Sequence, residues 1–368
     1  MKTDTASRLG AIIARHYEIG ELADYEQLRL GYVNISYAIE TVVNGERKKY
    51  FLRRYKEGTK AEEIEFEHSI INHLVARHFD LVAQIIETRN GRTYVERLEQ
   101  GKSAFYAVFD FLSGEDRYTW TTPTCTDAEL RNAAVALAQF HNAVFDLSPV
   151  GKRYEPKILD LLPGIAENAE RRASGAGETE FDKYLVENLD LMLQTVQRTW
   201  RAINEQQCKK MVQQVIHCDY HPGNLKFQNG QVVGLFDFDW SKVDARCFDV
   251  ALAITYFCTV WEKGRDGDLQ LDKTTTFLHA YQETLGDVQG VGPLTETELE
   301  CLPHMIHASN LYVLNWTIVD FYGHEADPHE YLIYLKHGVR TMRWLEDRDN
   351  WNSLKNATRH GVCQEDQW

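Results

Sequence analysis

Apolar and polar residues follow two different periods along the chain, and the change of period divides it into two parts. In the first part, residues 5–17 carry apolar side chains at the spacing of an amphipathic helix. Short runs rich in β-branched and aromatic residues follow, separated by turn residues such as Asn44-Gly45. These runs predict an antiparallel sheet of about five strands, at residues 27–30, 37–43, 49–55, 93–98 and 105–111.

A helix predicted between these strands carries a charge on its apolar face. Residues 61–76 have the helical period, and Glu67 lies on the apolar face three residues after Ile64. A buried carboxylate without a partner costs free energy, so this pattern requires a cation nearby. Arg53 can supply this cation, because it lies on the predicted strand 49–55 and shares one face of it with two aromatic residues. The sequence therefore predicts an Arg53–Glu67 ion pair.

The second part of the chain is predicted to be mainly helical. Thr126 and Glu129 form a capping box, and His141 lies on the apolar face of the helix that follows, as expected of a hydrogen-bonded core residue. Residues after Glu346 show little periodicity, and the last of them are expected to be mobile. Further helices are predicted at residues 158–173, 181–204, 249–261, 274–285, 296–319 and 330–346.

A short hairpin interrupts the helical pattern. Asn229-Gly230 separates two short runs of strand-forming residues, which is the strongest short-range hairpin signal. Because a hairpin brings its outer ends together, Asn224 before the first strand is predicted to lie near Asp237 after the second. The loop ahead of Asn224 contains Asp219 and a Pro-Gly pair that excludes a continuing helix or strand.

Two carboxylates and an amide oxygen at one end of a hairpin suggest a metal-assisted reaction. Hard oxygen ligands suit Mg²⁺, which takes its other ligands from phosphates and water. Asp219, if it is not a ligand, can accept a proton, and phosphoryl transfer needs this division of roles. The alternative is a metal-dependent hydrolase in which His217, Asp219 and His221 hold Zn²⁺ or Mn²⁺. That alternative requires a further cluster of ligands.

The motif His217-x-Asp219-x4-Asn224, followed by Asp237, resembles the catalytic loop and metal site of the aminoglycoside phosphotransferase and choline kinase superfamily, relatives of the protein kinases. The resemblance is specific, because four residues, the Pro-Gly pair and the intervening hairpin agree together. It covers the chain from about residue 25 to residue 345 and is faintest across the C-terminal helices.

The resemblance implies a kinase-like α+β fold with two lobes. A small sheet-rich N-lobe would comprise residues 1–112, and a larger helical C-lobe residues 113–368. ATP would bind through a hinge, with the Asp110 carbonyl and the Leu112 N–H facing adenine. The loop joining two strands would cover the phosphates, with Gly31, Asn34 and Ser36 nearest the nucleotide.

The resemblance also implies roles for the charged residues. Arg53 stands where the family usually has a lysine. That lysine pairs with the helical glutamate, here Glu67, and holds the nucleotide phosphates. Arginine can also bind phosphate, but with a different geometry. Asp219 would orient or deprotonate the acceptor hydroxyl. Asn224 and Asp237 would bind Mg²⁺. The remaining residues would be His217 and Asp249 as loop support, and His221 and Asp239 as candidates for substrate contact or a second metal.

Composition narrows the class of partner. The chain of 368 residues has 40 Lys+Arg against 55 Asp+Glu, a net charge of −15, which disfavours nucleic acid or an anionic membrane as the main partner. Seven scattered cysteines without a Cys-x-x-Cys pair are typical of a reducing compartment. The N-terminus lacks an uninterrupted apolar signal core, and no apolar run reaches the roughly 20 residues of a membrane span. We therefore expect a cytoplasmic protein; the sequence does not determine its oligomeric state.

Two departures from the protein kinases favour a metabolite kinase. His221 stands where protein kinases carry a lysine, and no activation segment of the usual length follows Asp237. Residues 316–322 resemble the homoserine-kinase-type branch, so the predicted acceptor is an amino alcohol or a hydroxy amino acid such as homoserine. An aminoglycoside, choline or a sugar are the alternatives.

The alternative from another class is a catalytically silent nucleotide-binding module. Only Arg53 in place of lysine suggests it. The intact Asp219, Asn224 and Asp237 oppose it, since a protein that only binds nucleotide has no chemical need for all three.

Overall fold

The computed structural model describes residues 2–28, 34–203, 205–286, 288–323 and 327–360. The chain divides into two compact units. We call the first the sheet unit; it comprises Met1–Glu115, Ser148–Tyr154 and Val233–Asp239. We call the second the helical unit; it comprises Asp116–Leu147, Glu155–Val232 and Trp240–Trp368.

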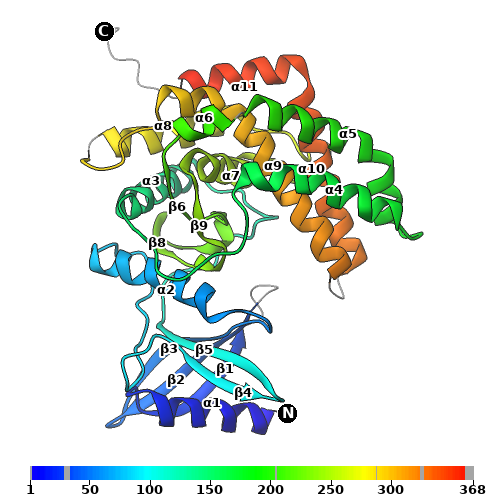
Figure 1. The fold of residues 1–368 in the computed structure, drawn as a ribbon. Coiled ribbons are helices and arrows are strands. Elements are labelled where there is room, and N and C mark those ends of the chain that lie inside the picture. Colours follow the sequence, from blue (N-terminus) through cyan, green and yellow to red (C-terminus); the bar gives the residue numbers. More distant parts are fainter. Residues whose placement is uncertain (1, 29–33, 204, 287, 324–326, 361–368) are drawn as a thin grey trace. The chain divides into compact units, whose positions relative to one another are not determined.

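The sheet unit contains a five-stranded antiparallel sheet in the order β1-β2-β3-β5-β4 (Figure 1). Each predicted strand overlaps a strand of the structure, although the first does so only at Gln27 and Leu28, because β1 begins at Glu21 and residues 29–30 lie outside the described ones. The elements are α1 (Lys2–His16), β1 (Glu21–Leu28), β2 (Ile35–Val43), β3 (Glu46–Arg54), α2 (Ala61–Ala76), β4 (Val95–Glu99) and β5 (Lys102–Asp110).

The two faces of this sheet are buried in different ways. On one face, Leu9 and Ile12 of α1 join a core cluster with Tyr50 and Leu52 of β3. Burial of each such side chain contributes about 1.5–3 kcal/mol. Because successive strand residues point to opposite faces, Arg53 lies on the other face. That face therefore carries the charged residues described below.

The helical unit holds most of the helices. Two small sheets follow the five-stranded one along the chain: β6 pairs with β9 and β7 with β8, and most of β8 belongs to the sheet unit. The predicted hairpin is therefore present. The helices and strands are α3 (Asp127–Val144), α4 (Ile158–Ser174), α5 (Glu180–Ala202), α6 (Glu205–Lys210), β6 (Gln213–Ile216), β7 (Leu225–Gln228), β8 (Gln231–Leu235), β9 (Lys242–Ala245), α7 (Arg246–Cys258), α8 (Leu271–Gly286), α9 (Glu296–Gly323), α10 (Pro328–Glu346) and α11 (Arg348–His360).

Residues 348–360 form the helix α11, which the sequence analysis did not predict because the residues after Glu346 show little periodicity. Asp347 caps α11, since its side chain accepts hydrogen bonds of 3.0 Å from the N–H groups of Asp349 and Asn350. The helix buries Leu354 completely, and the Trp351 ring lies 5.0 Å and 5.2 Å from two histidine rings of α9. So few apolar residues give too weak a periodic signal to detect. The expected mobility of the last residues concerns positions outside the described ones.

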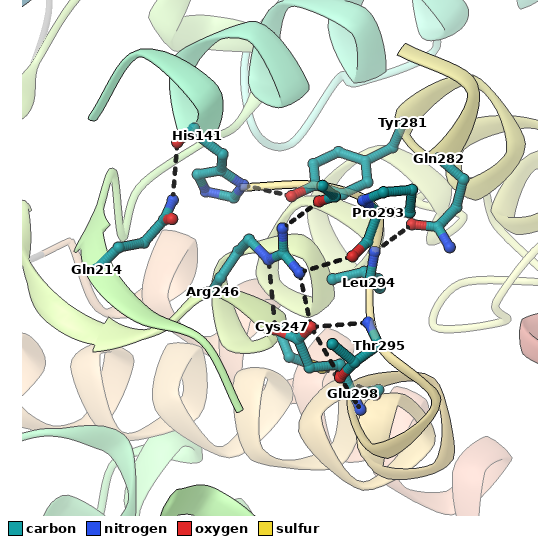
Figure 2. A network of polar contacts seen from close by, with 11 residues as sticks. His141, Gln214, Arg246, Cys247, Tyr281, Gln282, Pro293, Leu294, Thr295 and Glu298 are labelled. Atoms are coloured by element: carbon teal, nitrogen blue, oxygen red, sulfur yellow. Dashed lines mark hydrogen bonds and ion pairs between the residues drawn. The ribbon is translucent and has the colours of Figure 1, made fainter. Parts of the chain in front are cut away.

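Arg246, the first residue of α7, joins several parts of the helical unit (Figure 2). It is fully buried, and its Nη2 lies 2.6 Å from Oε2 of Glu298. Its Nη1 donates to the Gly292 carbonyl at 2.6 Å, and Nη2 also donates to the Pro293 carbonyl at 3.1 Å. Glu298 in turn accepts a hydrogen bond of 2.9 Å from the N–H of Thr295, just before α9. One buried ion pair thus fixes the start of α7 against the start of α9.

Candidate active site

The predicted ion pair between Arg53 and Glu67 is present in the sheet unit. Arg53 Nη1 lies 2.9 Å from Glu67 Oε1, and Arg53 Nη2 lies 2.9 Å from Asp237 Oδ1. The register of β2 and β3 sets Ser36 directly opposite Arg53. Carboxylates on both sides raise the pKa of Arg53 although burial alone would lower it. The arginine therefore links α2 to Asp237, two residues after the end of β8.

A second predicted residue, Asn34, contacts the same cluster. Its Nδ2 donates to Asp239 Oδ2 at 2.8 Å, and its Oδ1 accepts from the N–H of Lys56 at 3.0 Å. Asn34 thus ties the beginning of β2 to Asp239, a residue whose role the sequence left open. Gly31, predicted beside the phosphates, lies outside the described residues.

Two buried atoms of this cluster lack a hydrogen-bond partner within the described chain: Nε of Arg53, a donor, and Oδ1 of Asp239, an acceptor. Burial raises the pKa of Asp239, but the charge of Arg53 and the hydrogen bonds to the Asp239 carboxylate hold this pKa below its ordinary value. Asp239 is therefore ionised at neutral pH. A free donor suits an anion such as phosphate, and a free carboxylate oxygen suits a hard cation. The cluster therefore fits a magnesium nucleotide.

Glu67 makes the stability of the sheet unit depend on pH. Burial raises its pKa from 4.5 to about 7, with Arg53 opposing this shift. The folded state thus keeps a proton that the unfolded chain loses at about pH 4.5, and stability falls as pH rises towards 7. Relative to Glu67→Gln, we expect wild type to lose up to about 3 kcal/mol of unfolding free energy over this range. Urea unfolding at several pH values measures the difference.

The control is Glu62→Gln, which changes an exposed carboxylate of the same helix. It should leave the pH dependence of wild type in place. Parallel stability curves for wild type and Glu67→Gln would contradict the raised pKa of Glu67.

The helical unit contains the predicted catalytic loop. Asp219 is partly exposed, with 22% of its side chain accessible. Its Oδ2 accepts a hydrogen bond of 2.9 Å from Asn224 Nδ2, which also donates to the Asp219 carbonyl at 2.9 Å. Both contacts use the amide nitrogen of Asn224. Its amide oxygen is therefore the atom that can bind a cation. His221 Nδ1 accepts from the N–H of Gly223 at 3.0 Å and thereby shapes the same turn.

Asp249 supports the catalytic loop. Its two carboxylate oxygens accept hydrogen bonds of 2.8 Å from the N–H groups of His217 and Cys218. Cys218 has a φ of 64°, in the left-handed region that is costly for a residue other than glycine. Burial raises the pKa of Asp249, but hydrogen bonds from His141 and from the loop hold it below its ordinary value. The ionised carboxylate therefore stabilises the strained turn before Asp219.

Two residues complete this arrangement. His141 Nε2 lies 3.0 Å from Asp249 Oδ2, and its Nδ1 lies 2.7 Å from the Tyr281 hydroxyl, so it is the hydrogen-bonded core residue that the sequence predicted. No pattern in the sequence pointed to Tyr256, whose hydroxyl is hydrogen-bonded to Asp219. Burial raises the pKa of Tyr256 well above 10, so its hydroxyl stays protonated and donates to the carboxylate.

The remaining predictions concern the hinge and the metal. Asp110 ends β5, and its N–H donates to the Gln84 carbonyl at 2.9 Å; Leu112 follows outside the strand and is half-buried. Contact of either residue with adenine stays a prediction. The part of the chain that the structure describes has no group of three or more His, Cys, Asp or Glu placed to hold a metal. The three side chains of the hydrolase alternative therefore do not form such a group.

The fold and these two clusters define a class of protein. An antiparallel sheet with a buried Arg–Glu pair, and a helical unit whose loop presents a braced carboxylate, are the parts of a kinase-like phosphotransferase. Residues 24–286 match the model of the phosphotransferase enzyme family. The chain belongs to this family. It is an enzyme that transfers phosphate to a hydroxyl group of a small molecule, as the sequence predicted.

Individual relatives cover nearly the whole chain. A homoserine kinase of Bradyrhizobium sp. (strain BTAi1 / ATCC BAA-1182) is 26% identical over 342 residues, which is 91% of this chain and 93% of that protein. The structure of a microcompartment-associated aminopropanol kinase has a TM-score of 0.68 at 15% identity, covering 95% of this chain and 98% of the other. Amicoumacin kinase hAmiN, solved with AMP-PNP, Ca²⁺ and Ami, has a TM-score of 0.64 at 14% identity, covering 92% and 96%. These structures confirm the predicted kinase-like α+β fold.

Among the described residues, none of the helices has both the length and the apolar character to cross a bilayer.

Proposed function

We propose that the protein transfers the γ-phosphate of ATP to the hydroxyl of an amino alcohol or a hydroxy amino acid, with homoserine as the leading candidate. The observation that carries the reaction type is Asp219, a partly exposed carboxylate held by Asn224 and by the loop that Asp249 braces. The acceptor class is supported by the homoserine kinase that is 26% identical over 91% of the chain.

Each cluster has a separate role in this proposal. Asp219 accepts the proton of the acceptor hydroxyl, whose oxygen bonds to the γ-phosphorus while the bond to the bridging oxygen breaks and ADP leaves. Arg53 binds phosphate oxygens through its unpaired Nε–H. Asn224 and Asp237 bind Mg²⁺, and Asp239 contributes a further oxygen. When bound, the metal neutralises charge on the phosphates.

The nucleotide and the location are proposed on family grounds. A relative with the same fold was solved with AMP-PNP and Ca²⁺, an ATP analogue and a divalent cation. This supports ATP as phosphate donor and Mg²⁺ as its physiological ion. A small-molecule acceptor and a cytoplasmic location, as expected from the sequence, complete the proposal.

The test is ADP release from Mg-ATP by the purified protein with a panel of acceptors: homoserine, choline, ethanolamine, hydroxylysine, amino sugars and aminoglycosides. We expect one acceptor class to stimulate ADP release at least about tenfold above the background hydrolysis of ATP, because a positioned hydroxyl competes with water. Phosphorylated product is identified by mass spectrometry. Binding of Mg-ATP without stimulation by any hydroxyl compound would leave the silent-module alternative, and absence of ATP binding would contradict the proposal.

A further inference from the structure

A short segment between α3 and α4 belongs to the sheet unit although its neighbours in the chain do not. The segment comprises Ser148–Tyr154, while Leu147 before it and Glu155 after it belong to the helical unit. It contains neither helix nor strand, and we call it the return segment. Because its backbone has no regular hydrogen-bond pattern of its own, its position depends on contacts with its neighbours.

The return segment lies directly on the backbone of α2. At Gly151 the backbone has a φ of 88°, in the left-handed region. A Cβ at this position would lie 2.2 Å from the Glu62 carbonyl oxygen and 2.6 Å from the Phe66 nitrogen. Glycine alone combines this backbone conformation with so close an approach. Gly151 therefore lets the backbones of two distant segments touch.

Hydrogen bonds hold the return segment on both sides of Gly151. The N–H of Val150 donates to Ser69 Oγ at 3.1 Å, and the N–H of Lys152 donates to the Glu62 carbonyl at 2.9 Å. These contacts extend over about two turns of α2. Because they act at both ends of that stretch, they fix the position of α2 along its axis as well as its distance from the return segment.

Arg153 adds a positive charge beside the same helix. Its side chain is partly buried, and its Nη1 lies 3.8 Å from Glu63 Oε1 in the first turn of α2. Burial raises the pKa of Glu67, and the positive charges of Arg53 and Arg153 oppose this shift. Arg153 therefore acts both on the start of α2 and on the carboxylate that binds Arg53.

The stretch of α2 that the return segment contacts carries Glu67. This residue directly follows Phe66, whose nitrogen faces Gly151. Glu67 Oε1 lies 2.9 Å from Arg53 Nη1. Since N–H···O hydrogen bonds extend to about 3.2 Å, a displacement of α2 by about 1 Å would break this one. The place of α2 thus decides whether Glu67 can hold the guanidinium.

We propose that Gly151 and Arg153 are positioning residues of the nucleotide site: they hold α2 where Glu67 orients the Arg53 guanidinium towards the phosphates of Mg-ATP. This inference rests on the nucleotide site of the proposed function and adds to it residues that set the affinity for the nucleotide. Neither residue touches the nucleotide, and both act through α2. A return segment that only stabilised the sheet unit would leave the affinity of the folded protein for Mg-ATP unchanged.

The first test compares two glycine variants by calorimetric titration of the full-length protein with Mg-ATP. Gly151→Ala cannot keep the close approach to α2 and should weaken Mg-ATP binding about tenfold, the loss expected for one hydrogen bond between charged groups. The matched control is Gly45→Ala, because Gly45 has a φ of 87° and a Cβ there would have nothing within 4 Å. It has a similar backbone strain and should bind Mg-ATP as wild type does. Wild-type affinity in folded Gly151→Ala would overturn the inference.

A second set of variants decides the question if Gly151→Ala does not fold. Arg153→Met should weaken Mg-ATP binding about threefold. Arg153→Lys should restore most of the loss, because lysine keeps the charge beside Glu63. The control is Arg89→Met, which removes another ion-paired arginine of the sheet unit, 2.9 Å from Glu18. Wild-type affinity in Arg153→Met, with folding verified by thermal unfolding, would then overturn the inference.

A double-variant cycle shows whether the return segment acts through Glu67. Glu67→Gln removes the charge that α2 presents to Arg53. In this background, Gly151→Ala should weaken Mg-ATP binding by no more than about twofold, because the contact that it disturbs is already lost. An equal loss in both backgrounds would overturn the inference, since Gly151 would then act by another route.

Turnover separates this inference from the proposed function. ADP release by wild type, with unchanged Mg-ATP affinity in Gly151→Ala and Arg153→Met, would overturn the inference and leave the proposed function standing. Weaker Mg-ATP binding in these variants, with no acceptor phosphorylated by wild type, would support the inference and contradict the proposed transfer. Where transfer is measured, Gly151→Ala should raise the KM for Mg-ATP and leave the KM for the acceptor within about twofold of wild type.

Discussion

Replacing Asp219 by Asn should lower kcat about 10²–10⁴-fold while leaving the affinity for Mg-ATP nearly unchanged. The amide has the shape of the carboxylate and can still accept the hydrogen bond that Asn224 donates at 2.9 Å. It cannot accept a proton from the acceptor hydroxyl. The rate of ADP release and calorimetric titration with Mg-ATP measure the two effects separately.

The matched control is Asp272→Asn, which removes an exposed carboxylate of α8. It should leave both quantities as in wild type. Undiminished turnover in Asp219→Asn would refute the assignment of Asp219 as the base. Loss of Mg-ATP binding in the same variant would instead assign Asp219 to the metal.

Replacing Arg246 by Met should lower the free energy of unfolding by about 3–5 kcal/mol. The side chain is fully buried, and its removal leaves the carboxylate of Glu298 and the carbonyls of Gly292 and Pro293 without their donor. Urea unfolding followed by circular dichroism measures the change. A matched control is Arg265→Met, an arginine that is 67% exposed, with an expected change of about 0.5 kcal/mol or less.

A second substitution tests whether the cost comes from the unpaired carboxylate. Glu298→Gln in the Arg246→Met background removes the buried charge. The glutamine keeps an oxygen that can accept the hydrogen bond of 2.9 Å that the Thr295 N–H donates to Glu298 in wild type. The double variant should recover part of the lost stability. Equal losses in Arg246→Met and Arg265→Met would contradict the structural role of this ion pair.

Much of the candidate site could be predicted because its signals are local. The bounds predicted for α2 are those of the structure, since sixteen residues with a steady apolar period leave little ambiguity. The hairpin of β7 and β8 follows from Asn229-Gly230, whose backbone preference acts over a few residues. The Arg53–Glu67 pair followed from two local patterns and the cost of an unpaired buried charge.

Other parts were missed because no local pattern encodes them. β9 (Lys242–Ala245) was not among the predicted strands, and it is a strand only because β6 pairs with it, as Gln213 does with Ala245. α11 is mostly polar and depends on a few buried contacts with the rest of the helical unit. Tyr256 looked like one aromatic residue among many in an apolar run.

The sequence by itself determined the order of elements, the antiparallel sheet, the residue types of a phosphotransferase and the family to which the chain belongs. These depend on periodicity, turn residues and short motifs, which act between near neighbours. Only the tertiary structure decided which distant residues meet: Asp249 with the N–H groups of His217 and Cys218, Tyr256 with Asp219, and Trp120 with Tyr334. The physical reason is that burial and hydrogen bonding between distant segments depend on packing, which a linear pattern does not specify.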